Sequence, residues 1–137
     1  MLDKEKGLDA VTVSTPDHTH ATATLAAITR GKHAYVQKPL THSIFEARAL
    51  TEAAKKYKVV TQMGNQFASA DYVRITKEWI DAGLIGDVTR VYTWTNRPVW
   101  PQGVPTPTGK FAIPHELDWD LWLGPAKMID YNPAYLP

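Results

Sequence analysis

Hydrophobic and polar positions change period repeatedly along the first part of the chain. Short β-branched or apolar runs, the pattern of buried strands, occur at residues 9–15, 33–36 and 59–63. Each run is followed by apolar residues at the three- and four-residue spacing of an amphipathic helix. Strands that alternate with helices favour a parallel sheet with right-handed crossovers, so we expect an α/β fold.

Local signals predict where the helices begin and end. Ser43 and Glu46 have the spacing of a capping box, in which each side chain accepts a hydrogen bond from the other residue's backbone amide. Thr15 directly precedes Pro16 and is the expected N-cap of the first helix. Gly31 stands where a left-handed C-terminal cap is expected.

The pattern changes beyond the third predicted helix. Residues 87–96 alternate as a strand does, although neither face is purely apolar. Prolines and glycines crowd residues 97–115 and predict a loop; loops of this length usually belong to a site or to a contact with another subunit. Residues 117–123 form a short amphipathic segment that is expected to direct Leu121 inward.

Composition narrows the function classes. The chain has 137 residues, 44% of them hydrophobic, and a formal charge of +1, which is typical of a soluble globular protein. It lacks the basic excess that binds phosphate backbones, so no nucleic-acid partner is expected. No apolar run approaches the roughly 20 residues that span a bilayer, so no membrane partner is expected either. Without cysteine, and with histidines that show no ligand spacing, we expect no metal site.

Three motifs occur in a specific order, namely TPDHTH at residues 15–20, GKHAYVQKP at 31–39 and QMGN at 62–65. With these motifs the chain resembles the Gfo/Idh/MocA family, the relatives of glucose-fructose oxidoreductase and inositol dehydrogenase. The resemblance implies that residues 1–66 are the C-terminal half of a dinucleotide-binding Rossmann domain. Residues 67–137 would begin an α/β domain for substrate binding and oligomerisation.

The same resemblance implies an activity. The parent enzyme would transfer hydride between NAD or NADP and a hydroxyl group of a sugar or polyol. The superfamily also includes NAD-dependent glycosidases, which are a second candidate. The location stays open between the cytoplasm and the periplasm of a bacterium.

Two departures from the family pattern matter. Gln37 stands where the family usually has glutamate, which keeps hydrogen-bonding capacity but removes a negative charge beside Lys38. The family's G-x-G-x-x-G turn and its D-x-x-x-H motif do not occur in this sequence. We therefore expect an internal fragment that is inactive alone, with a catalytically inert piece that binds nothing as the alternative.

Lys38 is the candidate catalytic residue. It follows a strand at the carboxyl edge of the predicted sheet, where open α/β proteins bind ligands. A cation or base at the reacting hydroxyl lowers the barrier to hydride transfer. Pro39 would fix the backbone behind it, and the resemblance suggests a cis bond between the two. The plainer alternative is an exposed lysine before a turn.

Cofactor-binding side chains are expected in the turns at the same edge: Thr15, Pro16, Asp17, His20, Gln37, Lys38 and Asn65. Gln37 is expected to bond a hydroxyl of the nicotinamide ribose, and Asn65 to face the nicotinamide. The alternatives are a histidine packed on the sheet for His20 and turn-stabilising roles for Gln37 and Asn65.

Substrate contacts are expected from Lys38, Arg97 and Trp100, because a planar guanidinium and aromatic faces suit a carbohydrate. The alternative, which has more weight for Arg97 and Trp100, is that their long loop packs against another subunit. A homo-oligomer is expected for that reason, and because half a Rossmann sheet exposes its edges.

Overall fold

A computed structural model describes residues 1–97 and 101–136. The chain divides into two compact units. The first consists of Met1–Gln66 and Ala112–Tyr131, and the second consists of Phe67–Phe111 and the residues from Asn132 onward.

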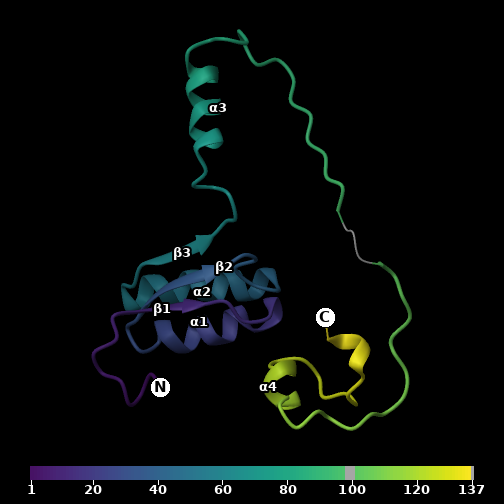
Figure 1. Cartoon of the computed structure of the whole chain (residues 1–137). Helices are drawn as coiled ribbons and strands as arrows, with labels where there is room; N and C mark the ends of the chain where they lie inside the picture. The colour runs from purple at the N-terminus through teal and green to yellow at the C-terminus, as the bar shows by residue number, and fades with distance from the viewer. Residues whose placement is uncertain (98–100, 137) are drawn as a thin grey trace. The chain divides into compact units, whose positions relative to one another are not determined.

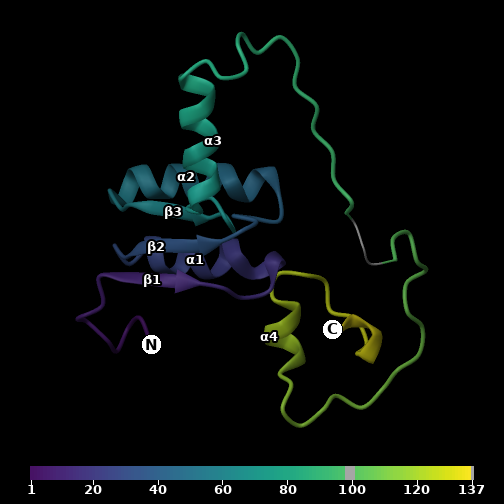
Figure 2. The same ribbon diagram turned by 45° about the horizontal axis from the view of Figure 1, so that its top comes forward.

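The first unit is built on a three-stranded parallel sheet in the order β1-β2-β3 (Figure 1, Figure 2). The strands are β1 (Ala10–Val13), β2 (His33–Gln37) and β3 (Thr61–Gly64), at the three predicted runs. In the central strand, Val36 pairs with Val13 on one side and with Met63 on the other. The expected α/β fold with a Rossmann-like parallel sheet is confirmed.

Two helices, α1 (His20–Ile28) and α2 (Ile44–Tyr57), pack side by side against one face of the sheet. Because strand side chains alternate, Val13, Ala34 and Val36 point toward the helices and are buried. The opposite face carries Thr12, Tyr35 and Gln62, which are all exposed. The core of the first unit therefore lies on one side of the sheet.

Two helix ends, the start of α2 and the end of α1, form as the local sequence predicts. The Ser43 hydroxyl accepts from the Glu46 amide at 3.3 Å, and the Glu46 carboxylate accepts from the Ser43 amide at 2.9 Å. The capping box is therefore confirmed. Gly31 has a φ of +72°, so the left-handed end of the first helix is confirmed as well.

The expected N-cap at Thr15 was wrong. A 3-10 turn, η1 (Asp17–Thr19), precedes α1, because both the amide and the hydroxyl of Thr19 donate to the Pro16 carbonyl at 2.9 Å. The Thr15 and Thr19 hydroxyl oxygens lie 2.8 Å apart, so the Thr15 side chain bonds Thr19 instead of capping the helix.

An ion pair holds the N-terminal turn to the end of the first helix. The Arg30 guanidinium donates to the Asp3 carboxylate at 2.7 Å. This hydrogen bond and the charge of Arg30 hold the pKa of the Asp3 carboxyl below its usual value. The pair lies at the amino edge of the sheet, away from the turns that follow the strands.

The short helix α4 (Trp119–Leu123) also belongs to the first unit. Trp119 stacks on Trp122 with ring centroids 4.9 Å apart and meets Tyr131 edge-on at 5.2 Å. This aromatic cluster selects the buried face, so Trp119 is 4% exposed whereas Leu121 is 73% exposed. The expectation that Leu121 points inward was wrong.

The second unit contains α3 (Asp71–Asp81) and the 3-10 turn η2 (Pro133–Tyr135). The apolar side chains of α3, including Tyr72 and Trp79, are exposed. The strand suggested by the alternation at residues 87–96 does not form in the described structure. An extended segment becomes a strand only when another strand bonds to it, and no neighbour does so in these ranges.

Within residues 1–97 and 101–136, every helix is too short or too polar to cross a membrane.

Removal of the N-cap of α2 tests its contribution to the fold. Ser43→Ala should lower the free energy of unfolding by about 1 kcal/mol, because the Glu46 amide loses its acceptor. Urea unfolding measures this, and Ser43→Asp, which keeps an acceptor at the N-cap, is the matched control. Equal stability of Ser43→Ala and the unaltered chain would contradict the prediction.

Candidate functional site

The turns that follow the three strands form one edge of the sheet, which we call the carboxyl edge and define as residues 14–19, 38–42 and 65–66. Parallel strands end on the same side, so segments far apart in the sequence meet there (Figure 1). This edge holds most of the residues expected to bind cofactor.

Hydrogen bonds link the three turns. The Lys38 amide donates to the Gly64 carbonyl at 3.1 Å and joins the second turn to the third. The His20 ring joins the second turn to the first, with Nδ1 2.6 Å from the Pro39 carbonyl oxygen and Nε2 2.8 Å from the Thr15 carbonyl oxygen. Hydrogen bonds therefore join the second turn to both the first turn and the third turn.

Lys38 stands exposed between these links. Within the described residues its ammonium makes no hydrogen bond or ion pair, so it is free to meet a ligand. The bond between Lys38 and Pro39 is cis, as the resemblance suggested.

Gly64 allows a close approach at the end of the third strand. A Cβ atom added there would lie 2.7 Å from Gln37 Oε1 and 2.8 Å from the Tyr35 hydroxyl. Both side chains therefore lie over the glycine on the face that the helices leave open. The half-buried Gln37 is held beside Lys38, and the exposed Asn65 follows directly.

The first turn presents both exposed and buried groups. Thr15, Pro16 and Asp17 are exposed at the edge. His20 is 1% exposed, and both of its ring nitrogens contact carbonyl oxygens. This geometry supports a positioning role, whereas a direct contact between His20 and a cofactor stays a prediction.

Two residues of the long loop were also expected to reach substrate. Arg97 belongs to the second unit, and Trp100 lies outside the described residues. Their substrate roles stay predictions.

Sequence reasoning missed a contact between η1 and α4. His18 Nε2 donates to the Trp122 carbonyl at 2.7 Å, and the two rings lie 5.4 Å apart. Gly124 approaches Thr19 so closely that a Cβ atom would lie 2.7 Å from Thr19 Cγ2. The bonded residues are 104 positions apart, so no local spacing signals the contact.

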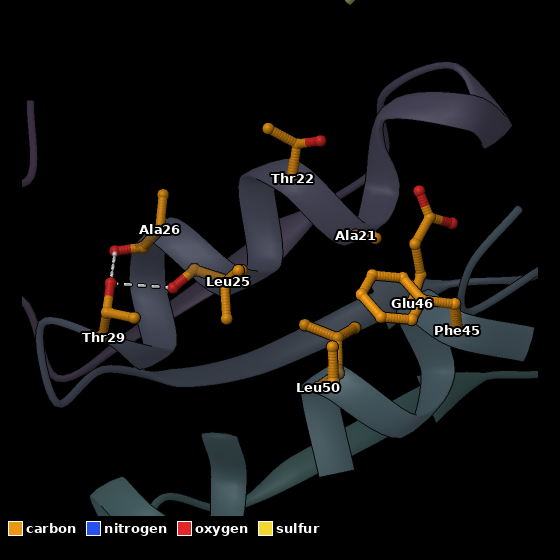
Figure 3. A pocket seen from close by; sticks show the side chains of 9 residues that line it. Ala21, Thr22, Leu25, Ala26, Thr29, Phe45, Glu46 and Leu50 are labelled. Carbon is orange, nitrogen blue, oxygen red and sulfur yellow. Dashed lines mark hydrogen bonds between the residues drawn. The ribbon is translucent and has the colours of Figure 1, made fainter. Parts of the chain in front are cut away.

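A groove of about 410 Å³ lies between the two long helices (Figure 3). Its walls are mainly apolar and include Leu25, Phe45 and Leu50. Its carboxylate, Glu46, already accepts from the amides of His42 and Ser43. That carboxylate therefore takes part in capping the start of α2. In the described part of the chain, no three histidine or acidic side chains are placed to hold a metal ion.

Comparison with known proteins gives a family match for the part of the chain that carries this edge. Residues 1–65 match a family model described as an oxidoreductase family with an NAD-binding Rossmann fold. This segment contains all three strands and both long helices.

Curated relatives and solved structures agree with that match. The scyllo-inositol 2-dehydrogenase (NAD(+)) of Bacillus subtilis (strain 168) is 37% identical over 61% of this chain and 24% of its own length. The inositol dehydrogenase homolog from Azotobacter vinelandii, solved with NADH and myo-inositol, has a TM-score of 0.58 at 30% identity and covers 63% of this chain and 23% of its own. Myo-inositol 2-dehydrogenase from Lactobacillus plantarum has a TM-score of 0.60 at 27% identity, with coverage of 64% and 26%. The chain thus spans about a quarter of the length of these proteins.

Crowding at Gly64 tests the arrangement of the edge. Gly64→Ala should displace the Gln37 and Tyr35 side chains and lower the free energy of unfolding by about 1 kcal/mol. Chemical-shift changes at residues 35–38 and urea unfolding measure the two effects. Gly7→Ala is the matched control, because a Cβ atom there meets nothing within 4 Å. Unchanged Gln37 shifts in Gly64→Ala would contradict the arrangement.

Proposed function

The chain belongs to the Gfo/Idh/MocA family of oxidoreductases, and on that premise we propose that its carboxyl edge binds the nicotinamide half of NAD or NADP. There Lys38 meets a hydroxyl group of a sugar or polyol. The observation that carries this proposal is the pair of links, through the Lys38 amide and the His20 ring, that gathers the turns of three strands.

The side chains at the edge suit such a ligand. The hydroxyl of Thr15, the carboxylate of Asp17 and the amide of Asn65 are exposed there and can bond ribose hydroxyls and a carboxamide. Gln37 adds an amide group on the open face of the sheet. This donor set fits a dinucleotide, and the edge lies where open α/β proteins bind one.

Lys38 would handle the proton of the substrate. When bound, the nicotinamide supplies the chemistry of hydride acceptance and return. Oxidation of an alcohol also releases the hydroxyl proton, and Lys38 Nζ would take it in the neutral form and return it in the reverse direction. Gln37 holds its place beside Lys38 without adding a charge.

Titration calorimetry with NAD and with NADP tests cofactor binding. We expect saturable binding to the whole chain, reduced about tenfold in Lys38→Ala and in Gln37→Ala, because each loses a hydrogen bond to the ligand. Lys32→Ala is the matched control, since this lysine directly precedes the same strand at its opposite end. Equal affinities of Lys38→Ala and Lys32→Ala would contradict the assignment, and no heat at millimolar cofactor would favour an inert chain.

Transfer of hydride needs its own assay. The relatives named above make scyllo-inositol and myo-inositol the first test substrates. With the whole chain and NAD, formation of reduced nicotinamide that is lost in Lys38→Met would support the catalytic role of Lys38. Where the unaltered chain shows a measurable rate, an equal rate in Lys38→Met would exclude that role.

We also propose that the chain forms a homo-oligomer. In the described structure β1 pairs on one side only, and Tyr35 and Val60 lie exposed on or beside the open face. Unpaired strand edges and exposed apolar side chains favour association.

Thr12→Lys, on the open face of β1, should shift the mass measured by light scattering toward the monomer. Thr22→Lys is the control, because Thr22 is exposed on α1, which covers the other face of the sheet. A monomeric unaltered chain at high concentration would refute the proposal.

A further inference from the structure

The His20 ring lies between two backbone carbonyl oxygens. His20 is the first residue of α1, and its side chain is 1% exposed. Nδ1 lies 2.6 Å from the Pro39 oxygen and Nε2 lies 2.8 Å from the Thr15 oxygen. Both ring nitrogens are therefore within hydrogen-bond distance of a carbonyl oxygen.

These two partners determine which form of the ring fits. A carbonyl oxygen only accepts, whereas a neutral imidazole donates from one nitrogen and carries a lone pair on the other. A neutral ring would therefore satisfy one carbonyl and place its lone pair against the other. The imidazolium form donates from both nitrogens and satisfies both.

Other forces act on the charge. Burial disfavours a charged ring, and so does the amino end of a helix. The titratable side chains on the flanking elements are Asp17, His18, Lys38, His42 and Glu46. In the described residues none of them is hydrogen bonded to the ring, and Glu46 accepts from backbone amides instead. The two carbonyl oxygens are thus the groups that favour the charged form.

We propose that His20 is a positioning residue, held as an imidazolium, that fastens the Lys38–Pro39 turn to the Thr15 turn. Loss of one ring proton would release one of the two turns. The protonation state follows from the ring geometry alone, while its effect on cofactor binding rests on the proposed function.

Long-range proton–nitrogen NMR of the whole labelled chain tests the protonation state. At about pH 7.5, where an unperturbed histidine is largely neutral, both nitrogens of His20 should carry protons. The exposed rings of His42 and His115 in the same spectrum serve as internal references. A lone pair on either nitrogen of His20 at that pH, in the folded chain, would overturn the inference.

Amide exchange tests the positioning role. His20→Ala should speed exchange of the Lys38 amide, which bonds the Gly64 carbonyl, about tenfold. His18→Ala, whose ring bonds the Trp122 carbonyl, should leave that rate unchanged. His20→Gln can donate from one nitrogen only, so an intermediate rate is expected, and this variant is used if His20→Ala does not fold. A Lys38 rate unchanged in a folded His20 variant would refute the role.

A titration of the same samples with NAD separates this inference from the proposed function. A doubly protonated ring with fast Lys38 exchange in the variant, but no NAD binding to the unaltered chain, would support the inference and refute the proposed function. A neutral ring would refute the inference whether or not NAD binds.

Discussion

The pairing of β2 with a strand on each side determines where every candidate side chain of the first unit stands. Because Val36 pairs with both Val13 and Met63, the three strands end in register. Their parallel direction then brings three turns to one edge. The helices cover one face and bury Val36 completely, so polar groups collect at the strand ends. The polar edge beside the apolar core is therefore a consequence of the fold itself.

Features that depend on neighbouring residues could be predicted from the sequence. The capping box joins Ser43 to Glu46, three positions away, and the left-handed end of the first helix needs only Gly31. The parallel direction of the strands followed from the regular alternation of short apolar runs and helices. The location of Lys38 at the carboxyl edge followed in turn, because it directly succeeds a strand.

Features that depend on distant residues could not be predicted in this way. Pro39, whose carbonyl oxygen contacts the His20 ring, is 19 positions away in the sequence. The sequence alone therefore could not decide whether His20 binds cofactor or packs on the sheet. The spacing of apolar residues assigned Leu121 to the buried face. Stacking of Trp119 with Trp122 instead buries the face of α4 that carries Trp119. The alternation at residues 87–96 is necessary for a strand but not sufficient, since pairing requires a second segment.

The charge on His20 and the shape of the edge depend on each other. Two hydrogen bonds to a charged ring contribute about 1.5–3 kcal/mol each. The amino end of α1 opposes the charge by only about 0.3–1 kcal/mol, so the larger cost is burial of the ring. Loss of either carbonyl contact removes one of the two hydrogen bonds that offset the cost of burial. The two turns thus stabilise the proton on His20, and the protonated ring holds the two turns together. Gln37 adds no carboxylate to this edge, so Lys38 in its protonated form and the imidazolium that we propose for His20 would together outweigh Asp17. A positive balance of this kind favours a ligand that carries phosphate groups.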